Sequence, residues 1–408
     1  MNDNIVITGI GVVSSIGIGK DNFWQALEEA KSGISPVTLF DTSYLKVKLG
    51  AEIKDFRPQE ILGEKGLRNL DRATKLLLCA GKLALEDAKL EVNEENTCSL
   101  GISIGTTLGS IWSISEFDKT ALRDGPHFVN PAEFPNTVIN SPASQLAIRL
   151  KIKGPCATLS TGFTSSLDAI KYGIDLIRNQ KAETVLVGGV EEFCEQTYLG
   201  FYKLKFLAGI KANELNCPFD KRRNGIIFGE GSAVLVLEKE STAKKRKAKI
   251  YGRILGFSSF FYPYAINKYE PKAQGLKKAM RLALEEANLS IEEIDYISCA
   301  ANSTQEADLI ETNAIKEVFG KRAKEIPLSA TKSMLAETFS AAGALATAAT
   351  VGAIEKGFIP ATINYQEKDP LCDLDYVPNF SRKKQIQNAL INCFGPTGSN
   401  AALVIAKV

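Results

Sequence analysis

The sequence has 408 residues, of which 45% are hydrophobic and 24% are charged, and its formal net charge is +2. These proportions are ordinary for a folded globular protein and exclude a disordered, collagen-like or highly charged repeat protein. The nearly balanced charge gives no electrostatic footprint for nucleic acid, so we expect no nucleic-acid partner. No apolar run reaches the ~20 residues that span a bilayer, and Ile5–Gly9 has the pattern of a strand rather than of a secretion signal. We therefore expect a cytoplasmic protein without membrane contact.

Apolar segments alternate with amphipathic segments along the whole chain. In the first half, the predicted elements are, in chain order, a strand at Ile5–Ile10, a helix at Lys75–Asp87, a strand at Leu100–Ile104, a helix at Ser165–Asn179, and strands at Thr184–Val187 and Ala233–Leu237. In the second half, they are a strand at Ile250–Leu255, a helix at Gly275–Asn288, a strand at Tyr296–Cys299, a helix at Asp308–Phe319, and strands at Ala389–Asn392 and Ala401–Ile405. Strands that alternate with helices predict an α/β protein with largely buried sheets.

A basic stretch, Lys244–Lys249, separates the two series of elements. One series closes with a hydrophobic strand before this stretch, and a new series opens after it. We therefore predict two halves, residues 1–245 and 246–408. The stretch itself is predicted to be a solvated helix end and loop, and the alternative is a patch that meets an acidic partner.

The cysteines and the single histidine argue against several kinds of chemistry. None of the eight cysteines shares a CxxC spacing with another, so the sequence predicts neither a metal site nor a redox motif, and we expect reduced thiols. Enzymes that use acid–base chemistry usually depend on histidine. The one histidine, His127, lies in the loop-like segment Gly125–Phe128 and is predicted to be structural.

Two glycine-containing loops have the appearance of binding sites. Gly9–Ser14 follows a strand as a dinucleotide fingerprint does, but the third glycine of that motif is missing, so nucleotide binding is not expected. The second loop, Gly154–Ser166, passes from a strand through a turn of small residues into a helix. Such a turn places Phe163 at a helix N-terminus, where N–H groups favour an anion and where a nucleophile would be activated. Phenylalanine offers no nucleophile.

Around this loop the sequence resembles the β-ketoacyl-acyl-carrier-protein synthases, the ketosynthases of the thiolase fold. The segments that carry the resemblance are Val6–Ser14, Phe219–Gly225, Gly229–Gly231, Ala330–Met334, Ser340–Ala344, Pro360–Asn364, Phe394–Gly395 and Gly398–Asn400. They occur in the family's order over nearly the whole chain. The resemblance implies a thiolase-like α/β fold, in which duplicated βαβαβαββ halves form a five-layer α-β-α-β-α arrangement.

The resemblance also implies a catalytic cysteine, two histidines and an oxyanion hole of backbone N–H groups, and the matching positions lack them. Phe163 stands at the cysteine position, Ala300 at the first histidine position and Glu337 at the second. Pro396 stands where a backbone N–H would donate to the oxyanion, and proline has no N–H. One such donor is typically worth about 10²–10³ in rate. We therefore expect no condensation by this chain alone and assign it no catalytic residue.

Three charged residues match positions that surround the family's site, namely Asp308, Glu311 and Lys332. We expect them to form a buried structural ion network. Cys156 and Cys299 are candidates for a replacement nucleophile, but both are predicted to be small core residues instead.

Within the family, the missing residues resemble those of a chain-length factor of a type II polyketide synthase. The resemblance implies a heterodimer with an active ketosynthase, formed through a strand at about Cys156–Thr161, a phosphopantetheinylated acyl carrier protein as a further partner, and no cofactor. It also implies that Ile111, Trp112 and Ser115 face the interface and gate the acyl tunnel. The alternative for Trp112 and Phe117 is that they are ordinary core anchors.

Other functions remain open. The product is expected to be an aromatic polyketide, and an aryl polyene is the alternative. A divergent acyltransferase or hydrolase could use Glu337 as its base. A homodimer that stores or presents acyl chains without a partner is the third hypothesis.

Overall fold

The computed structural model describes residues 3–408, and its first half forms one set of five main strands. These are β1 (Ile5–Ser14), β5 (Leu100–Gly105), β6 (Cys156–Leu159), β7 (Thr184–Glu191) and β8 (Gly231–Lys239). They lie in the spatial order β6-β5-β7-β8-β1, with β5 parallel to β6 and β7, and β8 antiparallel to β7 and β1. β6 has a neighbour on one side only and forms an open sheet edge.

The second half repeats this arrangement. Its strands are β9 (Gly252–Phe261), β10 (Tyr296–Ser298), β11 (Leu328–Ser329), β14 (Asn388–Phe394) and β15 (Ser399–Ala406). Their spatial order, β11-β10-β14-β15-β9, is the order of the first half with each strand replaced by its counterpart. The predicted duplication of βαβαβαββ halves is confirmed.

The two sets join into one mixed sheet through β1 and β9. Ile5–Ile7 of β1 pair antiparallel with Gly252–Ile254 of β9. The predicted boundary after residue 245 falls between α8 (Glu240–Lys245) and β9. The start of β1 therefore connects both halves.

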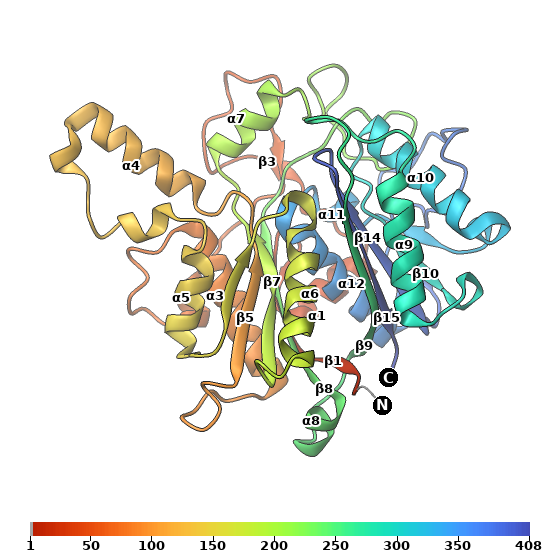
Figure 1. The fold of residues 1–408 in the computed structure, drawn as a ribbon. Helices are drawn as coiled ribbons and strands as arrows, with labels where there is room; N and C mark the ends of the chain where they lie inside the picture. Colours follow the sequence, from red (N-terminus) through yellow and green to blue (C-terminus); the bar gives the residue numbers. More distant parts are fainter. Residues whose placement is uncertain (1–2) are drawn as a thin grey trace.

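The helices form three layers around the strands (Figure 1). α3 (Arg72–Ala88) and α5 (Ser141–Leu150) cover the outer face of the first half, and α9 (Gln274–Ala287) and α10 (Gln305–Phe319) cover that of the second. α6 (Ser165–Arg178) and α12 (Ala342–Lys356) lie between the two sets of strands and contact both halves. The predicted five-layer arrangement is confirmed.

Shorter elements complete the fold. They are β2 (Gly17–Ile18), α1 (Lys20–Glu28), β3 (Ser35–Pro36), β4 (Leu49–Gly50), α2 (Pro58–Leu62), α7 (Glu195–Lys203), α11 (Lys332–Leu335), β12 (Phe358–Ile359) and β13 (Arg382–Lys383). Within residues 3–408, no helix combines the length and the apolar composition needed to cross a membrane.

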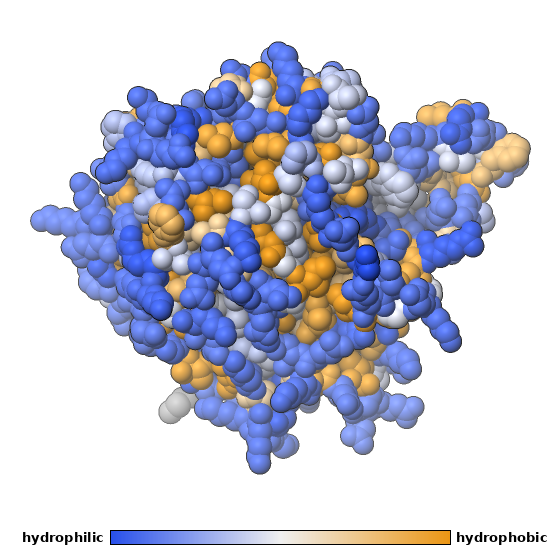
Figure 2. Space-filling model, turned by 180° about the vertical axis from the view of Figure 1, so that it is seen from behind, coloured by the Kyte–Doolittle hydropathy of each residue, from blue (hydrophilic) through white to orange (hydrophobic). Residues whose placement is uncertain are grey.

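An arm projects from the body between β5 and α5 (Figure 1). It consists of α4 (Ile111–Asp124) and two 3-10 turns, η1 (Pro126–Phe128) and η2 (Phe134–Thr137), and Ser113 is the buried residue of α4. Its exposed apolar side chains are Trp112, Leu122, Phe128 and Phe134, and Val138 and Ile139 follow directly after it. Figure 2 shows hydrophobic surface on the projecting part. A helix that buries almost nothing within its own chain is typical of a surface that meets another molecule.

Two expectations about individual residues are wrong. Trp112 is not a core anchor, because 48% of its surface is exposed on the arm. Cys156 is not a core residue, because it lies exposed at the start of the edge strand β6. Cys299 is buried as expected.

Candidate active site and its closure

Phe163 lies at the entrance to the central helix α6. Gly162 takes a φ of +72°, which reverses the chain after β6, and the short 3-10 turn Gly162–Thr164 leads directly into α6. The Ser165 hydroxyl donates to the Gly162 carbonyl oxygen at 2.6 Å and fixes the turn. The phenyl ring points inward and is only 3% exposed.

The ring of Phe163 is the end of a continuous aromatic cluster. It meets Phe339 edge-on, with ring centroids 4.5 Å apart, and Phe339 meets Phe201 at 5.6 Å. Phe201 in turn stacks on Phe228 at 5.2 Å, and Phe228 on Phe193 at 6.0 Å. Close-packed rings leave no space for a substrate beside Phe163.

The loop at Pro396 closes the opposite side of this ring. A Cβ atom at Gly395 would lie 2.3 Å from the Phe163 ring, so only glycine fits there. The Gly395 N–H donates to the Ser399 carbonyl oxygen at 3.1 Å, and Pro396 carries no N–H. Neither Gly395 nor Pro396 therefore offers an amide to the position that a reacting carbonyl would occupy.

Glu337 is held by neighbours on all sides. Its Oε2 accepts hydrogen bonds from Lys332 Nζ at 2.8 Å and from Asn302 Nδ2 at 3.0 Å, and its Oε1 accepts from the Phe339 N–H at 3.0 Å. The residue is 1% exposed. A carboxylate so engaged neutralises Lys332 and orders the chain toward Phe339.

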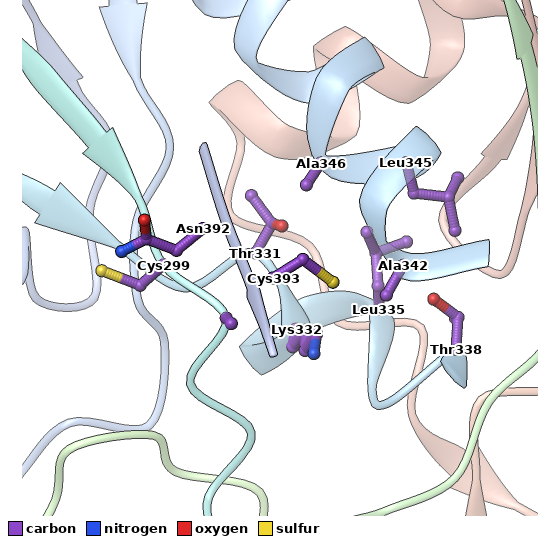
Figure 3. Close-up of a pocket in the computed structure, with 11 residues that line it drawn as sticks. Cys299, Thr331, Lys332, Leu335, Thr338, Ala342, Leu345, Ala346, Asn392 and Cys393 are labelled. Atoms are coloured by element: carbon purple, nitrogen blue, oxygen red, sulfur yellow. The ribbon is translucent and has the colours of Figure 1, made fainter. Parts of the chain in front are cut away.

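Lys332 retains its charge in this buried environment. Burial disfavours the charge, but the attraction of Glu337 outweighs it, so the pKa of Lys332 lies above its ordinary value. Lys332 and Asn392 line a closed cavity of about 10 Å³, which has the size of a single water molecule (Figure 3). Ala300 lines the same cavity. The space beside Ala300 in this cavity is thus too small for an acyl group.

Asp308 and Glu311 stabilise the loop that carries Ala300. The Glu311 carboxyl accepts the N–H groups of Ala300 at 2.9 Å and of Ala301 at 2.8 Å. Asp308 accepts the Asn302 N–H at 3.0 Å. Burial raises the pKa of Asp308 to about 6 and that of Glu311 to about 7. Both residues support the backbone here.

No reactive thiol faces this site among the cysteines of residues 3–408. Burial raises the pKa of Cys393 to about 12 and that of Cys299 well above its ordinary value. Cys156 is exposed as a residue, but its Sγ is partly covered where it donates to the Ala143 carbonyl oxygen, and this partial burial raises the pKa of the thiol. Within the same residues, no group of three His, Cys, Asp or Glu side chains is placed to hold a metal ion.

The structure brings the four substituted positions together and sets the predicted gate apart from them. Phe163 contacts the loop of Pro396, and the Glu337 segment touches both Phe163 and the loop of Ala300. The predicted gate residues lie instead at the base of the arm, where Trp112 is exposed and Ile111 and Ser115 are partly buried. A short loop connects the two regions, since the Thr107 hydroxyl donates to the Gly162 carbonyl oxygen at 3.2 Å.

Sequence analysis missed two carboxyls at the base of the arm, Glu191 and Glu192. Glu191 is the last residue of the buried strand β7, Glu192 follows it, and both are at most 1% exposed. Two consecutive acidic residues at the end of an otherwise apolar segment were a visible signal, because buried carboxyls require hydrogen-bond donors.

Comparison with known proteins agrees with the fold. The chain matches the family "Beta-ketoacyl synthase, N-terminal domain" over residues 2–243 and "Beta-ketoacyl synthase, C-terminal domain" over residues 251–366. It is 36% identical to a 3-oxoacyl-[acyl-carrier-protein] synthase 2 of Coxiella burnetii, with 99% of this chain and 98% of that protein covered. It is 34% identical to the tetracenomycin polyketide synthase ketoacyl synthase alpha subunit of Streptomyces glaucescens, with 99% and 97% covered.

Solved structures give the same result. The ishigamide ketosynthase/chain length factor superposes with a TM-score of 0.92 at 32% identity, and a type II polyketide synthase acyl-carrier protein in complex with its ketosynthase gives 0.92 at 28% identity. In both cases all of this chain and all of the solved chain are covered. The fold is the thiolase-like ketosynthase fold, and the chain belongs to the β-ketoacyl synthase family.

Proposed function

We propose that this chain is a non-catalytic chain-length factor, which pairs with an active ketosynthase and shapes the tunnel for the growing acyl chain. The observation that carries the proposal is the packing of Phe163. Its ring fills the position at which the family places a nucleophile, and Phe339 and Gly395 enclose it. A chain whose site is filled in this way supplies no reacting group. Under the proposal, it contributes an interface and part of the tunnel wall to an assembly.

The exposed surface supports a partner of the same fold. The edge strand β6 presents unpaired backbone groups, and the arm exposes apolar side chains that its own chain does not cover. One structural relative is described as a ketosynthase/chain length factor. We infer that β6 pairs with the corresponding strand of an active ketosynthase and that the arm lies over that partner.

An acyl carrier protein is the second proposed partner. One structural relative is a type II polyketide synthase acyl-carrier protein in complex with its ketosynthase. Under the proposal, the phosphopantetheinylated carrier protein delivers its acyl group to the active subunit, because the site of this chain has no room for it.

The geometry disfavours an enzyme that uses Glu337 as its base. Three hydrogen bonds occupy the carboxyl group, one of them donated by the buried ammonium of Lys332. A general base needs a free lone pair within reach of a substrate proton. If the purified chain turned over acyl thioesters and lost this activity in Glu337→Gln, the proposal would be wrong.

The test is purification of the tagged chain after co-expression with a ketosynthase that has an intact Cys-His-His set. We expect a one-to-one complex that condenses malonyl units, and neither condensation nor an acyl adduct with this chain alone. A stable homodimer that binds none of the ketosynthases tested would contradict the proposal and favour the acyl-storage hypothesis. Product analysis of the active pair then distinguishes an aromatic polyketide, which we propose, from an aryl polyene.

The first prediction concerns the gate at the base of the arm. We expect Trp112→Ala to lengthen the products of the pair and Ser115→Phe to shorten them, because close-packed walls limit the tunnel by volume. Ile111→Phe should act in the same direction as Ser115→Phe. The chain lengths are read by mass spectrometry, with Phe380→Ala, at an exposed site outside the arm, as the control. If all three variants gave products of wild-type length, these residues would not form the gate.

A further inference from the structure

The arm is attached to the body at the N-termini of two helices. The first-turn N–H groups of a helix have no acceptor within the helix, so they need one from elsewhere. Here a single carboxyl supplies it to both helices. Glu192 Oε1 accepts the N–H of Trp112, the second residue of α4, at 3.0 Å. Glu192 Oε2 accepts the N–H of Ala73, the second residue of α3, at 3.3 Å.

A second link crosses the same two helices. Asp71 is the N-cap of α3, and its Oδ1 accepts the Thr74 N–H at 2.6 Å. Its Oδ2 accepts the hydroxyl of Ser110, the N-cap of α4, at 2.5 Å. The N-cap residues of α3 and α4 are therefore bonded to each other, and Glu192 bridges the residues that follow them.

Glu191, the residue before Glu192, fixes the loop that leads into the arm. Glu191 accepts the N–H groups of Thr107 at 3.4 Å and of Leu108 at 3.2 Å, and it accepts the hydroxyl of Ser340. Burial raises the pKa of Glu192 to about 8, and the neighbouring carboxyls Asp71 and Glu191 add to this. The nearby Arg72 is already paired with Glu230 at 2.5 Å.

The apolar packing of α4 is partial. Ser113 is its buried residue, Ile111, Ile114 and Phe117 are half-buried, and the helix also contacts α7. The arm returns to the body through Asn136, whose Nδ2 donates to the Asn69 carbonyl oxygen at 2.6 Å. The polar contacts at the base of α4 therefore help to fix the angle at which the helix leaves the body.

We propose that Glu192 is a positioning residue that clamps the N-termini of α3 and α4 together and so sets the position of the tunnel gate. The part that concerns the gate rests on the proposed function, since Trp112 lies beside Ile111 at the clamped end. Glu192 contacts no substrate under this proposal. It acts through the backbone of the residue that carries the gating side chain.

The clamp is tested first in the full chain alone, by amide hydrogen exchange resolved to single residues. Glu192→Ala removes both acceptors, so we expect the Trp112 and Ala73 amides to exchange about tenfold faster, as the loss of a hydrogen bond worth about 1.4 kcal/mol allows. Glu192→Gln retains one carbonyl oxygen and should keep one of the two amides protected. A general loss of stability would instead accelerate the exchange of both amides.

The matched control is Glu183→Gln, the same chemical change at an exposed residue before the other end of β7. It should leave both amides protected. Ser110→Ala is the milder variant in case Glu192→Ala does not fold, and it should accelerate exchange at the start of α4 alone. The clamp would be overturned if the Trp112 and Ala73 amides both exchanged as slowly as in the wild type in Glu192→Gln. The same result in Glu192→Ala and Ser110→Ala would also overturn it.

The second readout is product length in the complex with the ketosynthase. With Glu192→Gln we expect a broader distribution of chain lengths at unchanged co-purification, because the gate moves while the interface persists. An unchanged distribution would overturn the link between the clamp and the gate. If the wild-type chain binds no ketosynthase, the proposed function fails, and the exchange experiment still decides the clamp.

Discussion

At the residue scale, the substituted side chains of the site are tightly packed. The site therefore differs from a catalytic ketosynthase site by more than the absence of catalytic side chains. Phe163 fills the space under the α6 N-terminus, Glu337 neutralises Lys332, and Gly395 accommodates the phenyl ring. Each substituted side chain has partners that suit it. The local structure is therefore that of a well-ordered core.

This packing predicts a measurable stability for the Phe163 side chain. Phe163→Ala should lower the free energy of unfolding by about 3–5 kcal/mol, since it opens a cavity within the aromatic cluster. Denaturant unfolding measures the change. Phe380, 81% exposed, provides the control, and Phe380→Ala should change the free energy by less than about 0.5 kcal/mol. Equal effects of the two variants would show that Phe163 is not packed as described.

The ion pair of Glu337 and Lys332 gives a second prediction at this scale. Glu337→Gln leaves the buried ammonium without a counter-charge, so we expect a loss of about 3 kcal/mol in the free energy of unfolding. Glu292→Gln, at an exposed position, should be nearly neutral. A Glu337→Gln protein as stable as the wild type would mean that the pair contributes nothing to the fold.

At the element scale, strands that form continuous apolar runs could be predicted from the sequence. A helix that lacks an amphipathic period could not. The predicted strands at Leu100–Ile104 and Thr184–Val187 match β5 and β7, because buried parallel strands are continuous apolar runs that end at glycines. α12 escaped detection because it is buried on almost all sides between the two sets of strands and shows no amphipathic period.

The site could be predicted only as a set of substitutions. Motif positions place Phe163, Glu337 and Pro396 near one another, but no sequence pattern tells that Glu337 binds Lys332 or that Phe339 stacks on Phe163. These contacts depend on segments far apart in the chain. The clamp at Glu192 was missed for the same reason.

The edge strand β6 carries a prediction about pairing. Ile102 donates to the Pro155 carbonyl oxygen and Thr106 to that of Leu159, so alternate residues of β6 face β5 and the Thr158 N–H faces the open edge. Thr158→Pro should abolish the complex with the ketosynthase while the chain stays folded, because proline removes an outward N–H only. Size-exclusion chromatography and circular dichroism separate the two effects, with Thr158→Val as the control. A Thr158→Pro complex of wild-type affinity would exclude pairing through β6.

At the scale of the whole molecule, buried carboxyls predict how stability depends on pH. Burial raises the pKa of Asp308 to about 6, of Glu191 and Glu311 to about 7, and of Glu192 to about 8. Between about pH 4.5 and pH 8, the folded protein therefore holds protons that the unfolded chain has released, and stability falls as the pH rises.

Thermal unfolding at pH 5.5 and pH 8.5 checks this sign. We expect the lower Tm at pH 8.5, with a difference in the free energy of unfolding of at least ~1 kcal/mol. Asp220, whose pKa hydrogen bonds lower to about 2 against the effect of burial, stays ionised throughout and does not change the trend. Glu192→Gln should show a smaller pH dependence than the wild type. A Tm that rises with pH would contradict the assignment.

The position of β1 has a consequence for synthesis on the ribosome. This strand is buried along its whole length, and both of its long partners, β8 and β9, begin more than 220 residues later in the chain. At roughly 5–20 residues per second, the first apolar strand emerges about 10–45 s before its partners exist. During that interval the apolar strand has only the short strand β2 as a partner, so production of this protein should depend on chaperones that hold a nascent N-terminus.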